Sequence, residues 1–243
     1  MTRSVAILGG AGGIGRAVVA ALKETGDDVI VLDLSASLER HRLDVPCIPI
    51  DVLSEAAIDA AVARLRRERP ALDGFVNLAG FNASIQPLSE TTTEYFDDVI
   101  AGNLRGAFLS TRAIMPLMSQ DGSVVMVASG LARFIRPGYG SYAAAKAGVI
   151  ALANTLALEF APKVRVNTVA PGLVDTAFLR GGTGRSDEAG ESVVNLGPYL
   201  SAIPLRRLAE PEDIVGPIRF LLGPDSGYMT GQVLWINGGA YMP

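Results

Sequence analysis

The sequence predicts an α/β protein in which helices cover both faces of a parallel β-sheet. Short apolar runs rich in β-branched residues recur along the chain, and they are continuous rather than alternating, which is typical of strands buried on both faces. Segments with helical periodicity separate these runs. Because strand and helix alternate throughout, the units are expected to be right-handed βαβ crossovers, which make the strands parallel.

The expected elements follow one another along the whole chain, residues 1–243, which we expect to form a single domain. The expected strands are 5–8, 29–32, 47–50, 75–78, 124–127, 164–169 and 233–236. The expected helices are 14–24, 55–68, 93–118, 141–160 and 212–222. Residues 173–204 form one long irregular region rich in Gly, Ser, Asp and Glu. Loops of this length in compact domains are usually functional or disordered, so this region is predicted to be a substrate lid.

The composition excludes several classes of function. The 25 acidic residues outnumber the 21 basic ones, and the arginines are scattered, so nucleic acid is not an expected partner. One cysteine and one histidine provide neither an internal disulfide nor a cluster with metal-ligand spacing. No uninterrupted apolar run approaches the length of a membrane helix or of a signal-peptide core. We therefore expect a cytosolic protein without a metal or a membrane partner.

A glycine-rich turn follows the first expected strand and opens directly into a helix. Its glycines, between Gly9 and Gly15, fit either G-x-G-x-x-G or G-x-x-x-G-x-G, and either pattern lets the backbone approach a pyrophosphate at the helix N-terminus. A turn that binds no ligand is the alternative. Asp33 ends the second strand, at the distance expected of the acid that binds an adenosine ribose, and no Lys or Arg follows it immediately. The cofactor is therefore predicted to be NAD rather than NADP.

Tyr142 and Lys146 lie four residues apart in a strongly helical segment, so their side chains share one face. A cation close to a phenol favours the phenolate, which can then exchange a proton near neutral pH. An ordinary surface helix carrying both residues is the alternative interpretation. The chain has only three lysines, Lys23, Lys146 and Lys163, against 18 arginines, which favours a specific use of the compact ammonium group.

Two further polar residues are candidates. Ser129 follows the strand 124–127, and residues at the carboxyl ends of parallel strands face the ligand cleft. Asn103 lies among apolar neighbours in the expected helix 93–118, where a surface amide is an equally good interpretation.

In these motifs the chain resembles the short-chain dehydrogenase/reductase family, in its short single-domain branch, from Val5 to Gly239. The resemblance assigns cofactor binding to Gly9, Gly13, Ile14, Gly15, Asp33, Asp51, Val52, Asn77, Ala79, Gly80, Tyr142, Lys146, Pro171, Gly172, Val174 and Thr176. It places the catalytic tetrad at Asn103, Ser129, Tyr142 and Lys146. The segments 230–232 and 237–239 resemble the closing part of the family's sequence.

The resemblance implies a doubly wound Rossmann-like fold with strand order 3-2-1-4-5-6-7, and a homotetramer or homodimer built through the helices 93–118 and 141–160. It implies that Tyr142 exchanges a proton with the substrate oxygen, while Lys146 lowers the pKa of Tyr142 and binds the nicotinamide ribose. Ser129 would orient the substrate and Asn103 would hold a water behind Lys146. Hydride transfer would then interconvert a secondary alcohol and a ketone, with NAD as the cofactor.

Three residues depart from the family pattern. Leu8, Leu78 and Met126 stand where hydrogen-bonding residues are usual, so less bracing of the cofactor loops is expected.

Two alternatives stay open. A 3-oxoacyl-carrier-protein reductase generally uses NADPH and carries basic patches, which Asp33 and the acidic balance do not favour. A non-catalytic NAD-binding sensor or scaffold would not need Tyr142 and Lys146 together. An enoyl reductase would space its tyrosine and lysine more widely than four, and an epimerase would usually be longer.

By the same resemblance, the residues that meet the substrate are Ser129, Leu131, Tyr139, Tyr142, Phe178 and Leu179. Most of these groups are apolar or aromatic, so an apolar or aromatic alcohol or ketone is expected to be preferred over a sugar. The competing possibility is that an arginine clamps an acidic substrate. The candidates for such a clamp are Arg133, Arg136, Arg180 and Arg185.

Overall fold

A seven-stranded parallel sheet forms the centre of the molecule. The computed structural model describes residues 2–180, 184 and 196–242. The strands lie in the order β3-β2-β1-β4-β5-β6-β7, which confirms the expected order. Their bounds are β1 (Ser4–Leu8), β2 (Asp28–Asp33), β3 (Cys47–Pro49), β4 (Leu72–Asn77), β5 (Met118–Val127), β6 (Val164–Pro171) and β7 (Val233–Ile236).

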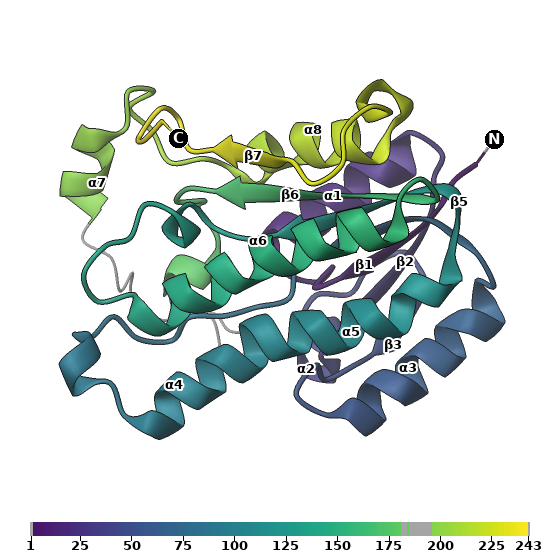
Figure 1. The fold of residues 1–243 in the computed structure, drawn as a ribbon, viewed down its shortest axis with the longest axis horizontal. Coiled ribbons are helices and arrows are strands. Elements are labelled where there is room, and N and C mark those ends of the chain that lie inside the picture. The colour runs from purple at the N-terminus through teal and green to yellow at the C-terminus, as the bar shows by residue number, and fades with distance from the viewer. Residues whose placement is uncertain (1, 181–183, 185–195, 243) are drawn as a thin grey trace.

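Helices cover both faces of this sheet (Figure 1). One face packs against α1 (Gly13–Glu24) and α8 (Pro211–Leu222). The other packs against α3 (Glu55–Glu68), α5 (Gly106–Ile114) and α6 (Gly140–Phe160). The remaining α-helices are α2 (Ser35–Arg40), α4 (Thr93–Ile100) and α7 (Leu196–Ala202). Figure 1 shows α7 beyond the carboxyl ends of β6 and β7.

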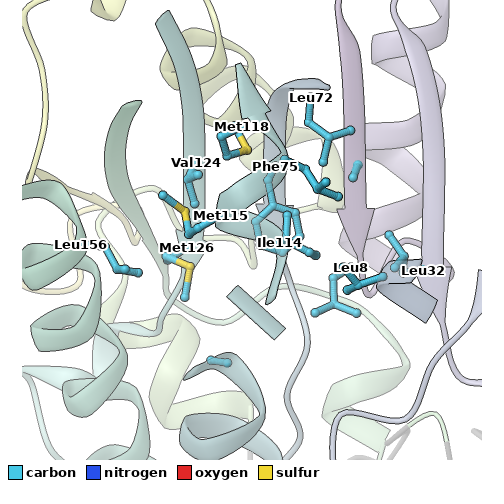
Figure 2. Packing of buried hydrophobic residues seen from close by; sticks show 14 of the residues in the cluster. Leu8, Leu32, Leu72, Phe75, Ile114, Met115, Met118, Val124, Met126 and Leu156 are labelled. Carbon is cyan, nitrogen blue, oxygen red and sulfur yellow. The ribbon is translucent and has the colours of Figure 1, made fainter. Parts of the chain in front are cut away.

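The two cores follow from the alternation of side chains along each buried strand. In β1, Ala6 and Leu8 point into the core beneath α3, α5 and α6, while Val5 and Ile7 point into the core beneath α1 and α8. The first core contains Phe75, Ile114 and the other residues drawn in Figure 2. Each large side chain buried in this way contributes about 1.5–3 kcal/mol to stability. Two-sided burial explains why the strands are continuous apolar runs in the sequence.

The helix expected across 93–118 is wrong as a single element. It is divided into α4, a π-helical turn at Ala101–Arg105, α5 and a 3₁₀ turn at Met115–Leu117, and Met118 already belongs to β5. The Asn103 side chain donates to the Val99 carbonyl at 2.9 Å, so it takes the i−4 acceptor within the helix. Pro116 lies at the start of the 3₁₀ turn, where it helps to end the helix.

Other boundaries also differ from the expectation. β4 begins at Leu72 and β5 at Met118, earlier than their apolar runs, because pairing continues through less apolar residues. α2 is a single short helix without a side-chain cap, and the apolar pattern did not reveal it. α7 and the 3₁₀ turn Ala177–Arg180 lie within the region expected to be irregular.

By length and composition, α6 could cross a membrane, with 21 residues and a mean hydropathy of 1.3. The sequence predicts this helix at 141–160, but its length and apolar composition do not stand out as a membrane span when only uninterrupted apolar runs are considered. In the structure, Val149, Ala153 and Leu156 of α6 are buried in the core against the sheet. A helix that packs on a sheet in this way is a core helix, and its apolar composition reflects that burial.

Candidate active site

A cleft lies over the carboxyl ends of the strands. Nearly all of the predicted cofactor and substrate residues line it, from Gly9 and Asp33 at one end to Ser129, Tyr142 and Phe178 at the other. The predicted substrate residues Leu131, Tyr139 and Leu179 line the same cleft. Asn77 and Asn103 do not line it, and both are buried behind it. The structure therefore brings the predicted residues together at one cleft, except that Asn77 and Asn103 lie behind the cleft wall rather than on it.

The glycine turn brings the start of α1 to the cleft. A side chain at Gly15 would overlap the Gly9 carbonyl, and one at Gly13 would overlap Thr176. The N-cap residue Gly12 provides no side-chain hydrogen bond, and the first turn of α1 has no acidic residue. The free N–H groups and the positive end of the helix dipole are therefore directed toward the cleft, where a phosphate is favoured.

Asp33 lies at the end of β2, beside this turn. Its carboxylate accepts hydrogen bonds from the backbone N–H groups of Ala11 at 2.8 Å and Leu34 at 2.7 Å. Burial raises the pKa of Asp33, and these two hydrogen bonds oppose the rise. The side chain is thus fixed in position with its acceptor oxygens at the cleft. This arrangement suits the binding of ribose hydroxyl groups.

Neighbouring residues brace the loops around the cleft. Asp51 accepts from the Leu53 N–H at 2.9 Å. Asn77 donates to the hydroxyl groups of Ser110 at 3.3 Å and Thr111 at 3.2 Å, and accepts from the Ala79 N–H at 3.2 Å. Through these hydrogen bonds, Asn77 fixes the loop after β4 to α5.

The residues that depart from the family pattern are accommodated in different ways. Leu78 packs against the core beneath α1 and α8, and its N–H donates to the Leu8 carbonyl at 2.8 Å. Met126 accepts a weak hydrogen bond from Thr111, with the hydroxyl 3.6 Å from its sulfur. Leu8 is buried in the core beneath α3, α5 and α6. Apolar packing thus replaces part of the usual polar bracing.

Tyr142 and Lys146 project from the same face of α6 into the cleft. The Lys146 Nζ lies 5.7 Å from the centroid of the Tyr142 ring and donates to the Val127 carbonyl at 3.1 Å. Ser129, two residues after β5, lies close enough to the Tyr142 hydroxyl to lower the pKa of Tyr142, and it accepts from the Leu131 N–H at 3.2 Å. A hydroxyl, a phenol and an ammonium group therefore converge on one part of the cleft.

Burial governs the protonation of this group. Burial raises the pKa of Tyr142, and the neighbouring Ser129 hydroxyl opposes the rise. Burial lowers the pKa of Lys146 to about 8, so the ammonium group remains charged at pH 7. A charged Lys146 close to Tyr142 favours the phenolate, which is the form that accepts a proton.

Asn103 lies on the other side of Gly80 from Lys146 and fixes the loop that contains Gly80. Its Oδ1 accepts from the Phe81 N–H at 3.1 Å, and its Nδ2 donates to the carbonyls of Phe81 at 2.7 Å and Val99 at 2.9 Å. Gly80 lies between the Asn103 side chain and Lys146, and a Cβ at this position would overlap both. The Asn103 amide is thus used to hold the loop after β4 against Lys146.

Replacing Lys146 with Met is expected to stabilise the cofactor-free protein by about 1–3 kcal/mol at pH 7. Because the folded-state pKa is lowered from 10.5 to about 8, the unfolded chain binds this proton more tightly. The cost to folding is full below about pH 8 and is relieved as the pH rises toward 10.5. The measurement is urea unfolding of both proteins at pH 7 and at pH 10.

The exposed Lys163 offers a matched control, because Lys163→Met removes an ammonium group that is already in solvent. Its stability should change little at either pH. The account of Lys146 fails if Lys146→Met unfolds at lower urea than the wild type at pH 7, or if its advantage does not shrink at pH 10.

The substrate end of the cleft is more aromatic than the sequence indicated. The Phe178 ring lies 6.0 Å from the Tyr142 ring. The cleft is also lined by Phe134, Tyr199 and Tyr241, which the sequence analysis did not identify. Tyr241 stacks on Phe134 with ring centroids 4.0 Å apart, and its hydroxyl lies where a side chain at position 130 would be. These residues come from the loop after β5, from α7 and from the C-terminal tail, so no local pattern could have grouped them.

The four arginines considered as a substrate clamp occupy different positions. Arg180 forms an ion pair with Asp175 at 2.7 Å. Arg133 is exposed and does not line the cleft, whereas Arg136 does line it. Arg185 lies outside the described residues. Residues 181–183 and 185–195 of the predicted lid between 173 and 204 are likewise outside them. Phe178, Leu179 and Tyr199, from its described parts, all line the cleft.

Comparisons with known proteins show the family and the fold of the chain. A family model described as enoyl-(acyl carrier protein) reductase matches residues 9–241. The chain is 34% identical to the 3-oxoacyl-[acyl-carrier-protein] reductase FabG of Thermotoga maritima, over 96% of this chain and 95% of the relative. It is 33% identical to the 4-formylbenzenesulfonate dehydrogenase TsaC1/TsaC2 of Comamonas testosteroni, over 98% of both chains.

Among solved structures, a similar one is the short-chain dehydrogenase/reductase SDR:glucose/ribitol dehydrogenase from Brucella melitensis. The TM-score is 0.87 at 27% sequence identity, and the match covers 99% of this chain and 97% of the other. The similarity therefore extends over the whole sheet and both helix layers.

Proposed function

Since this chain belongs to the short-chain dehydrogenase/reductase family, whose members are oxidoreductases that generally bind NAD(P), we propose that it is an NAD(H)-dependent oxidoreductase that interconverts a secondary alcohol and a ketone. The observation that carries the proposal is the convergence of Ser129, Tyr142 and Lys146 on a cleft that also contains the glycine turn. We place the acid–base role on Tyr142.

The cleft fits a dinucleotide. Asp33 offers carboxylate oxygens for the adenosine ribose, and the uncapped start of α1 faces the position of the pyrophosphate. Asp51 and Val52 would flank the adenine, while Lys146 and the segment from Pro171 to Thr176 would hold the nicotinamide side. When bound, the nicotinamide supplies or accepts the hydride.

The protein's own residues handle the proton. In ketone reduction, the Tyr142 hydroxyl donates its proton to the carbonyl oxygen as the carbonyl carbon gains the hydride, and alcohol oxidation reverses both transfers. Burial raises the pKa of Tyr142, and we assign to the charged Lys146 the role of opposing that rise. Ser129 orients the substrate oxygen beside Tyr142. We propose that Asn103 acts as a supporting residue, with a water in a relay behind Lys146.

The charge at the adenosine end of the cleft favours NAD over NADP. The carboxylates of Asp33 and Asp51 are the charged groups at the adenosine end among the described residues that line the cleft. A 2′-phosphate there would meet negative charge without an opposing cation from those lining residues. The Thermotoga maritima relative is named as a 3-oxoacyl-[acyl-carrier-protein] reductase, and such reductases generally use NADPH. The negative charge at the adenosine end therefore distinguishes the proposed activity from theirs.

A second candidate from a different class is a protein that binds NAD without turnover. The buried pair Tyr142 and Lys146 argues against it, because a charged lysine in a buried position is costly and pure binding does not require it. An enoyl reductase, the activity in the description of the matching family model, is disfavoured by the spacing of four between Tyr142 and Lys146.

We also propose a cytosolic homotetramer or homodimer, formed through α5 and α6. Phe108 on α5 and Leu158 on α6 are 41% and 83% exposed, and a subunit interface would cover such apolar side chains.

The substrate is proposed to be an aromatic or apolar ketone or secondary alcohol. Leu131, Phe178 and Leu179 offer apolar surface, which contributes about 25 cal/mol for each Å² of ligand surface buried. In a screen with NADH or NAD, kcat/KM for acetophenone and 1-phenylethanol should exceed that for ribitol or glucose by about tenfold or more. The readout is the absorbance of the reduced nicotinamide. A larger kcat/KM for the polyol than for the aryl alcohol would refute the apolar pocket.

A further inference from the structure

We propose that Arg136 is an anion-binding residue at the substrate end of the cleft, and that the enzyme acts on an aromatic substrate that carries a carboxylate or sulfonate group. The inference deepens the proposed function and rests on it for the reaction, although not for the binding of the anion. It concerns the chemical class of the substrate, which the catalytic residues alone do not determine.

The charges of the cleft are separated along its length. Among the described residues that line it, the acidic side chains are Asp33 and Asp51 and the basic ones are Lys146 and Arg136. Asp33 ends β2 and Asp51 follows β3, whereas Arg136 follows β5 on the opposite side of β1 and β4. Lys146 lies within the candidate catalytic group, so Arg136 is the remaining cation. A substrate anion at this end therefore meets no carboxylate among the described lining residues.

Arg136 is exposed at the surface, and one aromatic side chain contacts its guanidinium group. Its guanidinium carbon lies 4.6 Å from the centroid of the Tyr199 ring, a cation–π contact that orients the planar group. Among the described residues Arg136 has no ion pair, in contrast to Arg180, which is paired with Asp175. Its donors are therefore available for a bidentate contact with a carboxylate or sulfonate.

The surroundings favour an anion on an aromatic ring. Tyr139 also lines the cleft, and burial and the neighbouring Tyr199 raise its pKa, so its hydroxyl stays protonated. Burial raises the pKa of Tyr241 to about 12, so this phenol is also neutral near pH 7. Arg136 thus stands among neutral phenols, and the stacked rings of Phe134 and Tyr241 form an apolar wall of the same cleft. This combination matches a flat ring with one acidic substituent.

Binding can be tested without turnover. The probe is p-toluenesulfonate, titrated calorimetrically into the protein with and without saturating NADH, and compared with the neutral p-toluenesulfonamide. The wild type should bind the sulfonate at least about tenfold more tightly than the sulfonamide. Arg136→Gln should remove this preference, and Arg136→Lys should retain part of it, because the charge remains while the planar fork is lost.

Arg133→Gln is the matched control, because Arg133 is exposed and lies outside the cleft. It should bind the sulfonate as the wild type does. Thermal unfolding of all variants verifies that they are folded. The proposal is overturned if the wild type shows no preference for the sulfonate, or if Arg136→Gln and Arg133→Gln weaken sulfonate binding equally.

A kinetic arm separates this inference from the proposed reaction. It compares 4-acetylbenzenesulfonate with acetophenone, using NADH, and kcat/KM should favour the sulfonate about tenfold or more in the wild type but not in Arg136→Gln. If neither ketone is reduced while sulfonate binding still depends on Arg136, the reaction is wrong and the anion site stands. If acetophenone is reduced but the sulfonate gives no gain, the reaction stands and the anion site is wrong.

Discussion

Asp33→Ser is expected to reduce the preference for NAD over NADP from at least ~100-fold in the wild type to within about tenfold, expressed as the ratio of kcat/KM values. Both kcat/KM values should change. Turnover with NAD falls because the ribose hydroxyls lose their acceptor, and turnover with NADP rises because the 2′-phosphate no longer meets a carboxylate.

The size of the effect follows from the surroundings of Asp33. The side chain is held by the N–H groups of Ala11 and Leu34, at 2.8 and 2.7 Å, so it cannot easily turn away from a phosphate. Placing a phosphate beside such a fixed carboxylate costs several kcal/mol without a compensating cation. Serine keeps a small polar side chain but removes the charge.

The control is Asp44→Ser, which removes a carboxylate that is fully exposed and paired with Lys23 outside the cleft. Its cofactor preference should equal that of the wild type. Equal use of NAD and NADP by the unaltered protein would show that Asp33 does not select the cofactor.

Much of the fold could be predicted because the sheet is buried on both faces. Val5 and Ile7 face one core and Ala6 and Leu8 the other, so the strand is apolar at every position and stands out from the helices around it. The glycine turn and the pair Tyr142 and Lys146 could also be identified, because their spacing along the chain determines their arrangement in space.

Features that depend on tertiary contacts could not be predicted. At the break in the helix, the Asn103 amide bonds not only to the Val99 carbonyl but also to Phe81, which is 22 residues away in the sequence. Tyr199 and Tyr241 reach the substrate end from α7 and the C-terminal tail, and no periodic pattern connects them with Tyr142. The sequence likewise could not show which of the four candidate arginines lines the cleft, because that depends on the position of Arg136 in the folded chain.

Tyr142→Phe is expected to lower kcat by at least about 1,000-fold, while the Kd for NADH changes by no more than a few-fold. The substitution removes the hydroxyl that exchanges a proton with the substrate oxygen and keeps the ring, which packs 6.0 Å from Phe178. It removes no contact with a phosphate or with adenine. Ser129 retains its contact with the Leu131 N–H at 3.2 Å, so its position does not depend on the Tyr142 hydroxyl.

The effect should be specific to this hydroxyl. Tyr228 is fully exposed and does not line the cleft, so Tyr228→Phe removes a phenolic hydroxyl without touching the site. Its kcat should match that of the wild type.

The most direct test of the account is the kcat of Tyr142→Phe on a substrate that the wild type turns over, with NADH binding measured by fluorescence on the same preparation. We expect turnover to fall by about 1,000-fold or more with NADH binding retained. A variant that keeps a tenth of the wild-type kcat would contradict the assignment of Tyr142 as the acid–base group.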